Sequence, residues 1–236
     1  MVELVDTLQT ELHNLLGDAF TAYDMEQVHG TLVGLEGRQV GTEILNTNLI
    51  NASGESLAMD LEGIFHFLLN TPLLPLHIRI GGFVCSRVYP FTSRNLHPHV
   101  RSFSLCDQIA VVIGWPAEAE TYPMVLDRLR RLCTNYHVLH RYHEKPGDVD
   151  NDFFFVLNHI ERDLVTEEQI ESVQRHIRDW LSSCEPLDIE IGKEQLSVVA
   201  YSDRQLPTSS SLAYPLIESL ARLDDLKGLY QKRQSH

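Results

Sequence analysis

The sequence predicts an α+β protein in which largely antiparallel strands are backed by helices. Segments that alternate apolar and polar residues are separated by short turns, as strands are, and amphipathic segments with helical spacing lie between them. The order strand, helix, then two or more strands occurs over 27–115 and again over 152–201, with a helical segment at 122–136 in between. This order favours antiparallel sheets over a doubly wound parallel sheet. We expect one bilobal domain, because no linker is long enough to separate two.

The expected organisation of residues 1–236 has four parts. They are an N-terminal helix (1–20), a first lobe (27–115), a second lobe (116–207) and a C-terminal helix (212–232). The N-terminal helix has leucines at helical spacing and Gly17 near its end as a cap.

In the first lobe, the segment 27–35 is rich in Val, Thr and Leu, which predicts a strand. The polar segment 37–54 is expected to project from the main sheet as a hairpin. Helical periodicity over 57–69 stops before Pro72, since the residue before a proline disfavours the helical conformation. The next strand, 76–80, alternates apolar residues with His77 and Arg79.

In the second half, Thr166 and Gln169 form a capping box that predicts the start of a helix. Pro215 is suited to the first turn of a last helix. The other expected elements are strands at 100–105 and 108–115 joined at Cys106-Asp107, a helix at 122–136, strands at 138–143 and 152–160, and a hairpin of 187–191 with 195–201 around Gly192-Lys193.

Composition limits the partners and the compartment. The chain has 19 basic and 33 acidic residues, a formal charge of −14, so it lacks the basic stripe that duplex nucleic acid requires. The four cysteines form no CxxC pair, which predicts reduced core thiols rather than a disulfide framework or a zinc site. No signal peptide pattern opens the chain, and its most apolar stretch, 64–80, contains charged residues and prolines. We expect a cytoplasmic protein with no membrane partner; the sequence does not indicate its oligomeric state.

One short motif can carry chemistry. Residues two apart on a strand share a face, so His29 and Thr31 of the segment Val28-His29-Gly30-Thr31-Leu32 point the same way. There the imidazole can act as a general acid or base while the hydroxyl holds a phosphate oxygen. Gly30 leaves room for close packing on the opposite face. The pattern alone is weak, since a chain of this composition gives roughly 0.6 such matches by chance.

The motif and the order of elements together resemble the two-histidine phosphoesterase superfamily, the RNA ligase-like and cyclic phosphodiesterase-like proteins. The resemblance covers about residues 27–206, and His29-Gly30-Thr31-Leu32 matches the family motif. It implies two related lobes around a concave cleft, each supplying one His-x-Thr/Ser. It also implies a 2′,3′-cyclic phosphate or a related phosphodiester as ligand, with one histidine as base and the other as acid. No metal or organic cofactor is implied.

The strand that should hold the second motif departs from the family pattern. Alignment on Leu157 puts Phe154 in the histidine position and Val156 in the Thr/Ser position. Neither side chain can transfer a proton or bind phosphate. His159 follows, but strand alternation places it on the opposite face, so it can serve only if a bulge re-aims it.

Other residues are candidates to support His29. His77 and Arg79 share one face of a strand, and a guanidinium can hold a phosphate through two hydrogen bonds; the alternative is a solvated strand face. Arg101 and Tyr201 are weaker candidates. His137, His140 and His143 are spaced three apart, which suits a three-histidine metal site poorly on a helix or a strand.

The predicted function is therefore that of a phosphodiesterase-like protein that acts on or binds a small phosphodiester or nucleotide, such as a 2′,3′-cyclic nucleotide or an RNA end. His29 and Thr31 are the expected catalytic residues, and His77, Arg79 and His159 the expected ligand contacts. The alternative is a catalytically inactive ligand-binding or protein-interaction module that keeps the fold.

Overall fold

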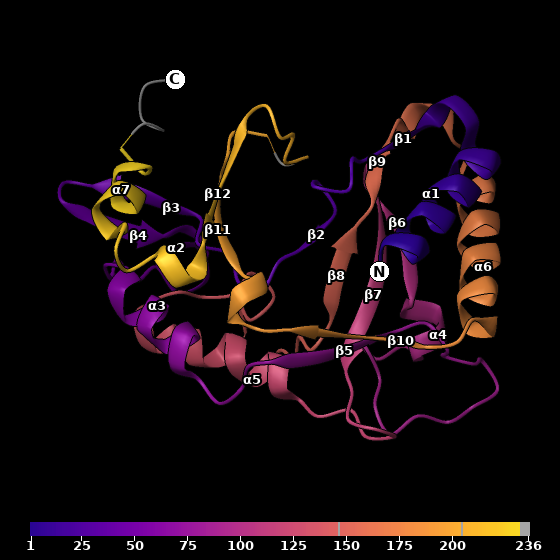
Figure 1. Ribbon diagram of the computed structural model, residues 1–236, viewed down its shortest axis with the longest axis horizontal. Coiled ribbons are helices and arrows are strands. Elements are labelled where there is room, and N and C mark those ends of the chain that lie inside the picture. The colour runs from indigo at the N-terminus through magenta and orange to yellow at the C-terminus, as the bar shows by residue number, and fades with distance from the viewer. Residues whose placement is uncertain (146, 204, 232–236) are drawn as a thin grey trace.

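A computed structural model describes residues 1–145, 147–203 and 205–231. Its centre is an antiparallel sheet of six strands, in the order β10-β5-β7-β8-β2 with β6 also paired to β7, and curled like half a barrel (Figure 1). The strands are β2 (His29–Gly30), β5 (Leu76–Ile80), β6 (Phe103–Cys106), β7 (Ile109–Pro116), β8 (Phe153–Val156) and β10 (Leu187–Ile191). The α+β class with antiparallel pairing is confirmed.

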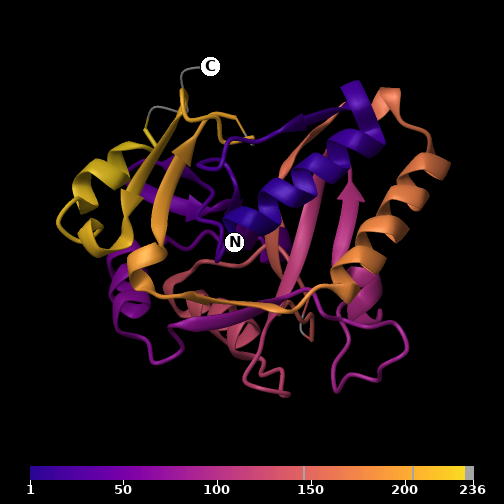
Figure 2. The same ribbon diagram turned by 45° about the vertical axis from the view of Figure 1, so that its right-hand side comes forward.

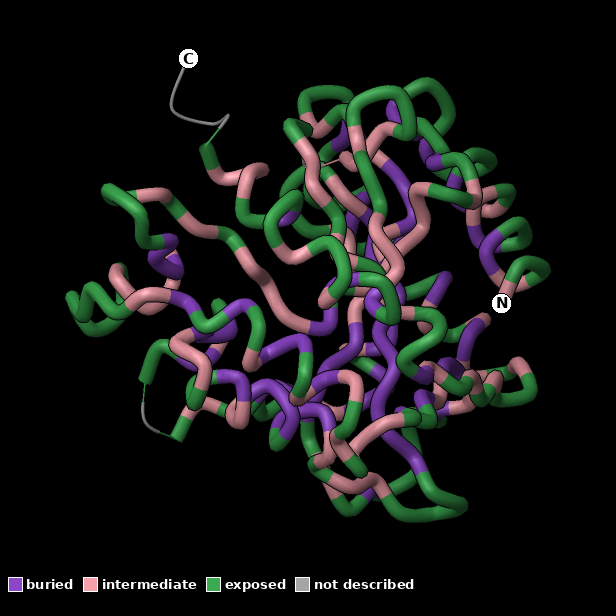
Figure 3. The backbone as a smooth tube through the Cα atoms, turned by 60° about the vertical axis from the view of Figure 1, so that its left-hand side comes forward, coloured by how far each residue is buried: buried purple, intermediate pink, exposed green. Residues whose placement is uncertain are grey.

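Helices cover one face of this sheet. Helices α1 (Val2–Leu16) and α6 (Glu167–Ser183) pack side by side near β6, as Figures 1 and 2 both show. Helices α3 (Leu61–Asn70) and α5 (Val125–Leu132) contribute to the same core, which also includes Phe153 and Phe155 of β8. We call this side of the sheet the core face. Buried backbone is concentrated at the sheet and its helices, whereas the outlying turns are exposed (Figure 3).

The opposite side of the sheet carries a second apolar cluster. Its strand residues are Val111, Ile113 and Trp115 of β7 with Phe154 and Val156 of β8, and we call this side the aromatic face. The segment between β5 and α4 (Pro98–Arg101) and the segment after β7 supply further rings to it: Phe83, Tyr89, Phe91 and Tyr122.

Three two-stranded sheets complete the fold. They are β1 (Phe20–Ala22) with β9 (Asn158–Ile160), β3 (Gly37–Val40) with β4 (Glu43–Asn46), and β11 (Ser197–Tyr201) with β12 (Ser211–Pro215). The remaining helices are the short α2 (Thr47–Ser53) and α7 (Leu223–Gly228). Among the described helices, none has both the length and the apolar character needed to cross a bilayer.

Local signals predicted several elements well. Helix α1 ends at Gly17 with a positive φ of 55°, and the capping box of Thr166 and Gln169 starts α6. The excursion over 37–54 contains the β3–β4 hairpin. Strands β6 and β7 form the expected hairpin, with Asp107 in its turn at a φ of 53°.

Other boundaries differ from the prediction. The hairpin of 187–191 with 195–201 is wrong, because β10 pairs with β5 and β11 pairs with β12. The expected strand at 152–160 divides at Leu157 into β8 and β9, that at 27–35 is reduced to β2, and 138–143 contains no strand. Residues 211–215 form β12, so the C-terminal helix begins later than predicted, at Leu223; its expected end at 232 lies outside the described residues.

The cysteine prediction holds only in part. All four thiols are free, but Cys133 alone is buried, whereas Cys85 and Cys106 are exposed.

Candidate functional site

The register of β2 with β8 decides which face the motif occupies. His29 pairs with Val156 and Gly30 with Phe155, in antiparallel orientation. Directly opposed residues share a face, so His29 lies on the aromatic face with Val156. Thr31 is exposed but lies just beyond the end of β2, which is only His29–Gly30, so strand pairing does not fix its side relative to His29.

Gly30 is required by the core beneath it. A Cβ atom built on Gly30 lies 2.1 Å from Cε1 of Phe153, far inside van der Waals contact. The Phe153 ring is 3% exposed and packs against Phe155 on the core face. The glycine of the motif therefore lets β2 approach β8 closely.

The imidazole of His29 is held in one tautomer. Its Nδ1 lies 2.6 Å from the carbonyl oxygen of Gln27, and because a carbonyl only accepts, Nδ1 carries the hydrogen. Burial lowers the pKa of His29, and the hydrogen bond to Gln27 offsets only part of this shift. The ring is therefore neutral at pH 7. Its Nε2 lone pair has no partner among the described residues, and this is the arrangement of a general base.

The backbone after the motif is fixed by a buried arginine. Arg130 of α5 is 1% exposed, and its guanidinium donates to the carbonyl oxygens of Thr31 (3.0 Å) and Leu32 (2.8 Å). The same group donates to Asp150 Oδ2 at 2.7 Å and to the carbonyl of Asp152 at 2.9 Å. Arg130 thus ties the His29–Thr31 segment to the residues that precede β8.

The two residues at the second motif position lie beside the first motif. Val156 is directly opposite His29, and Phe154, two residues before it on β8, shares the face of Val156. Both side chains are half-buried on the aromatic face. The described structure therefore places no second proton-transferring side chain at this position.

His159 lies in a different sheet. It belongs to β9, opposite Thr21 of β1, and its Nδ1 and Nε2 lie 3.1 Å from Gln205 Nε2 and 3.3 Å from Glu161 Oε1, respectively. The alternation slips by one residue between β8 and β9, because Leu157 and Ile160, three residues apart, both belong to the core, and their N–H groups donate to the carbonyls of Ala110 and Gln108. His159 therefore lies on the side away from the core, where Gln205 bonds both its ring and the side chain of Gln27.

Arg79 shares the aromatic face with His29 but lies far across it. Arg79 is opposite Trp115, whereas His29 is linked through Val156 to Val111. Across the strands, three strand spacings separate the two residues, roughly 14 Å. Along the strands, the four residues from Val111 to Trp115 add a separation of roughly 14 Å. The two residues are therefore not brought together.

The guanidinium of Arg79 is also occupied. Nε and NH2 each donate at 2.8 Å to the carboxylate of Asp188, and NH1 donates to the carbonyl of Ala119. Arg79 lowers the pKa of Asp188 accordingly. His77 is exposed on the same strand, with Nδ1 3.9 Å from Glu190. Both residues pair β5 with β10.

A buried polar network that was not predicted from the sequence lies beside the aromatic face. Asp152 accepts hydrogen bonds from Ser93 Oγ (2.7 Å), Trp115 Nε1 (2.7 Å) and Arg101 NH2 (3.3 Å). Asp150 accepts from His140 Nε2 at 2.8 Å as well as from Arg130. The available signal was the run of alternating aspartates at 148, 150 and 152 just before the apolar strand.

This network leaves some buried atoms without partners. Nδ1 of His140, Nδ1 of His143 and Oδ1 of Asp150 are buried and make no hydrogen bond among the described residues. Burial lowers the pKa of His140 to about 4, although its hydrogen bond to Asp150 opposes the shift, so this ring is neutral at pH 7. His143 donates instead to Asp127.

The remaining candidates have structural contacts. His137 lies next to the Ala58 carbonyl, with Nδ1 at 2.6 Å, and Tyr201 donates to Glu36. Within the described part of the chain, no group of three or more His, Cys, Asp or Glu side chains has the geometry to hold a metal ion.

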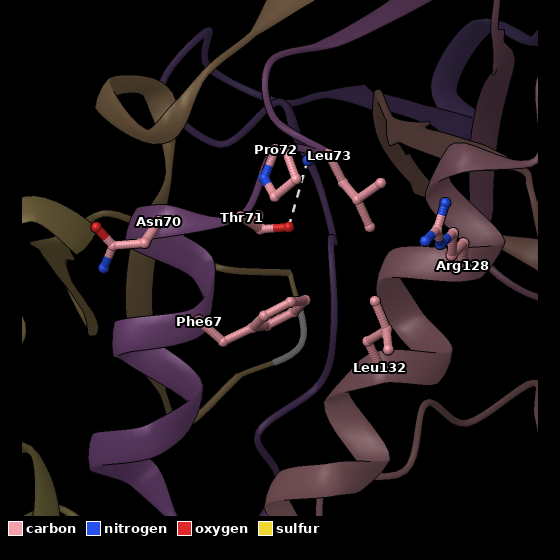
Figure 4. Close-up of a pocket in the computed structure, with 7 residues that line it drawn as sticks. All are labelled: Phe67, Asn70, Thr71, Pro72, Leu73, Arg128 and Leu132. Carbon is pink, nitrogen blue, oxygen red and sulfur yellow. Dashed lines mark hydrogen bonds between the residues drawn. The ribbon is translucent and has the colours of Figure 1, made fainter.

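A shallow groove of about 380 Å³ lies between α3 and α5, away from the motif (Figure 4). The side chains of Phe67, Leu73 and Leu132 line it, with Arg128 at one side and a hydrogen bond from Leu73 N to Thr71 Oγ1. It contains no carboxylate, imidazole or thiol, and so no acid–base pair. The aromatic face beside His29 is the better candidate site.

Comparison of the chain with protein-family models, with curated proteins and with solved structures gives no match, so its function is argued from this site alone.

Proposed function

We propose that the chain binds a small phosphodiester, such as a 2′,3′-cyclic nucleotide or an RNA end, on the aromatic face beside β2. The observation that carries the proposal is the His29 imidazole, whose Nδ1–H is bonded to Gln27 and whose Nε2 is unpartnered among the described residues. A neutral imidazole in this tautomer can take a proton at neutral pH. The exposed Thr31, two residues after His29, is the proposed hydrogen-bond donor to a phosphate oxygen.

The two-lobed architecture is part of this proposal. The first half of the chain supplies β2 and the second half supplies β8, and these strands meet edge to edge. In the family that the sequence resembles, each lobe supplies one motif to a shared cleft. The pairing of His29 with Val156 supports the same arrangement in this chain.

The chemical step would proceed with one imidazole. Water attacks the phosphorus of the cyclic diester, Nε2 of His29 takes the proton of that water, and the bond from phosphorus to the ribose 2′-oxygen breaks. The leaving 2′-oxygen takes its proton from solvent water, because Phe154 cannot give one, and His29 then returns its own proton to solvent. A positioned acid contributes about 10²- to 10⁴-fold to such a rate, so turnover is expected to be slow.

The first experiment measures hydrolysis of 2′,3′-cyclic AMP, with binding of the same nucleotide measured in parallel by calorimetry. His29→Ala is expected to abolish turnover and Thr31→Val to weaken binding. His66→Ala is the matched control, because His66 is exposed on α3, away from the sheet face. Neither binding nor turnover at millimolar nucleotide would refute the proposal.

A second experiment installs the missing motif. In this register a residue at 154 is the diagonal neighbour of His29, about 7–8 Å away between Cα atoms, which suits two groups on either side of one phosphate. The double variant Phe154→His/Val156→Thr is expected to raise turnover by up to about 10²-fold. An unchanged rate in a folded variant would contradict the placement of the ligand between β2 and β8.

Binding without turnover is the second candidate function. The observation that favours it is the occupation of the second motif position by Phe154 and Val156. Saturable binding of the cyclic nucleotide with no product formed, in a protein that Phe154→His/Val156→Thr makes active, would select this function.

A further inference from the structure

Arg94 stands at the tip of an unusual turn above the aromatic face. Ser93 and Leu96 form a β-bridge with both backbone hydrogen bonds, at 3.0 and 2.9 Å, so that Arg94 and Asn95 are the two central residues of the turn. Both have positive φ, 50° and 64°. Such turns favour Asn and Gly, and an arginine in this conformation is strained. Strain of this kind is found where the position of a side chain has a use.

The turn presents the guanidinium of Arg94 to the aromatic face. Its Cζ lies 4.3 Å from the ring centroid of Tyr142 and 5.4 Å from that of Phe154. These two rings lie 6.2 Å apart and hold the plane of the guanidinium from one side. Phe154 is on the same face as Val156, the residue opposite His29, and two residues from it along β8, so Arg94 lies on the same part of the face as His29.

The N–H groups of Arg94 form two long ion pairs but no hydrogen bond among the described residues. Its closest carboxylate oxygens are Asp150 Oδ1 and Asp152 Oδ2, both at 3.9 Å, which is beyond hydrogen-bond distance. Among the described residues no acceptor lies within hydrogen-bond distance, and the side chain is 39% exposed. Arg101 and Arg130 nearby, by contrast, donate to these aspartates directly.

The local charge favours an anion in spite of the −14 of the whole chain. Arg94, Arg101 and Arg130 form ion pairs with Asp150 and Asp152, and the adjacent Asp127 and Arg131 add one charge of each sign, so four positive charges face three negative ones. Arg101 and Arg130 are nearly buried, whereas Arg94 faces solvent. The surplus charge is therefore available at Arg94.

We infer that Arg94 is the phosphate-binding residue of the site, and that its guanidinium fork holds two oxygens of the phosphodiester from the side opposite His29. The inference rests on the proposed function for the identity of the ligand and adds a residue that the sequence motif does not contain. A fork of two parallel N–H groups matches a phosphate better than a single ammonium does. Tyr142 and Phe154 keep the fork oriented before the ligand arrives.

The test uses two ligands, 2′,3′-cyclic AMP and inorganic phosphate, with the full chain. By calorimetry, Arg94→Gln is expected to weaken binding of the cyclic nucleotide about 10- to 100-fold, since hydrogen bonds to charged groups are lost. Arg94→Lys is expected to fall between Arg94→Gln and the unchanged protein, because it keeps the charge without the fork. Arg87→Gln is the control, as Arg87 is exposed and paired with Glu120. Circular dichroism checks that each variant is folded.

The outcomes separate this inference from the proposed function. Nucleotide binding that is unchanged in Arg94→Gln, but lost in His29→Ala, overturns the role of Arg94 and leaves the proposed function in place. If the nucleotide does not bind at all, the proposed function fails. A titration with inorganic phosphate then tests by itself whether Arg94 binds a phosphate group. The side-chain Nε–H resonance of Arg94, assigned by its loss in Arg94→Lys, then shifts saturably if the inference is right. An unchanged resonance overturns it.

Discussion

The glycine of the motif offers a direct test of how β2 is held against the sheet. A Cβ atom on Gly30 would lie 2.1, 2.7 and 2.9 Å from three carbons of the Phe153 ring, where contacts below 3.0 Å force a shift. The ring is buried at 3% exposure and packed against Phe155, so it has little space to move. Gly30→Ala is therefore an overpacking substitution, and we expect it to lower the free energy of unfolding by about 1–3 kcal/mol.

Urea unfolding followed by tryptophan fluorescence measures this change. Phe153→Leu reduces the side chain that clashes, so Gly30→Ala should cost less in its presence, with a coupling free energy of about 0.5–3 kcal/mol. Gly228→Ala is the matched control: a Cβ there meets no atom within 4 Å, and the expected change is within about 0.5 kcal/mol. A cost below about 0.5 kcal/mol for Gly30→Ala, or strict additivity of the pair, would refute the packing argument.

Three further predictions concern the buried polar and thiol groups. Arg130→Met leaves the buried carboxylate of Asp150 without its guanidinium partner and should cost about 3–5 kcal/mol in urea unfolding, whereas the exposed Arg128→Met on the same helix should cost under about 0.5 kcal/mol. His140, with a folded pKa of about 4 against an ordinary 6.5, should titrate near pH 4 by NMR. Stability then falls as the pH drops from 6.5 to 4, because the unfolded chain takes up the proton first; a midpoint above pH 6 would contradict this. Cys133, whose pKa burial raises to about 12, should react with a disulfide reagent only after unfolding, while the exposed Cys85 reacts at once; Cys133→Ser should remove the slow thiol alone.

The elements that the sequence predicted well are those with local causes. The leucine spacing of α1, the capping box of α6 and the tight connection of β6 to β7 each depend on residues close together in the chain. The pairing of β10 was missed because a turn at Gly192-Lys193 suggests a local hairpin, whereas the partner of a strand can be distant. A usable signal was present: Asp188 and Glu190 alternate along β10 as Arg79 and His77 do along β5, and opposite charges directly across a strand pair stabilise it.

The candidate site also combines features that local sequence predicts with features that depend on contacts between distant residues. The strand at His29 and the packing role of Gly30 follow from local pattern, whereas the side on which Thr31 lies stays a prediction, because β2 ends at Gly30. The place of Arg94 depends on a turn with two positive φ values and on Tyr142, which is distant in sequence, and no local pattern indicates that contact. The alignment that put Phe154 and Val156 at the second motif position is consistent with the register of β2 and β8.

The two proposals together explain why the second histidine position holds a phenylalanine. A histidine at 154 would lie beside the guanidinium of Arg94, whose positive charge lowers the pKa of the ring and so reduces the fraction that is protonated at neutral pH, which limits the gain from Phe154→His. Phe154 instead offers its ring face to that guanidinium, at 5.4 Å from the centroid, and fixes the cation in place. A fixed cation tightens binding of the phosphate and stabilises the charge that develops on its oxygens, but it supplies no proton to the leaving oxygen. An arginine on an aromatic platform in place of the second acid therefore favours retention of the phosphodiester over its hydrolysis. This is why binding and turnover have to be measured on the same ligand, and why the ratio of the two, rather than turnover alone, describes what the site does.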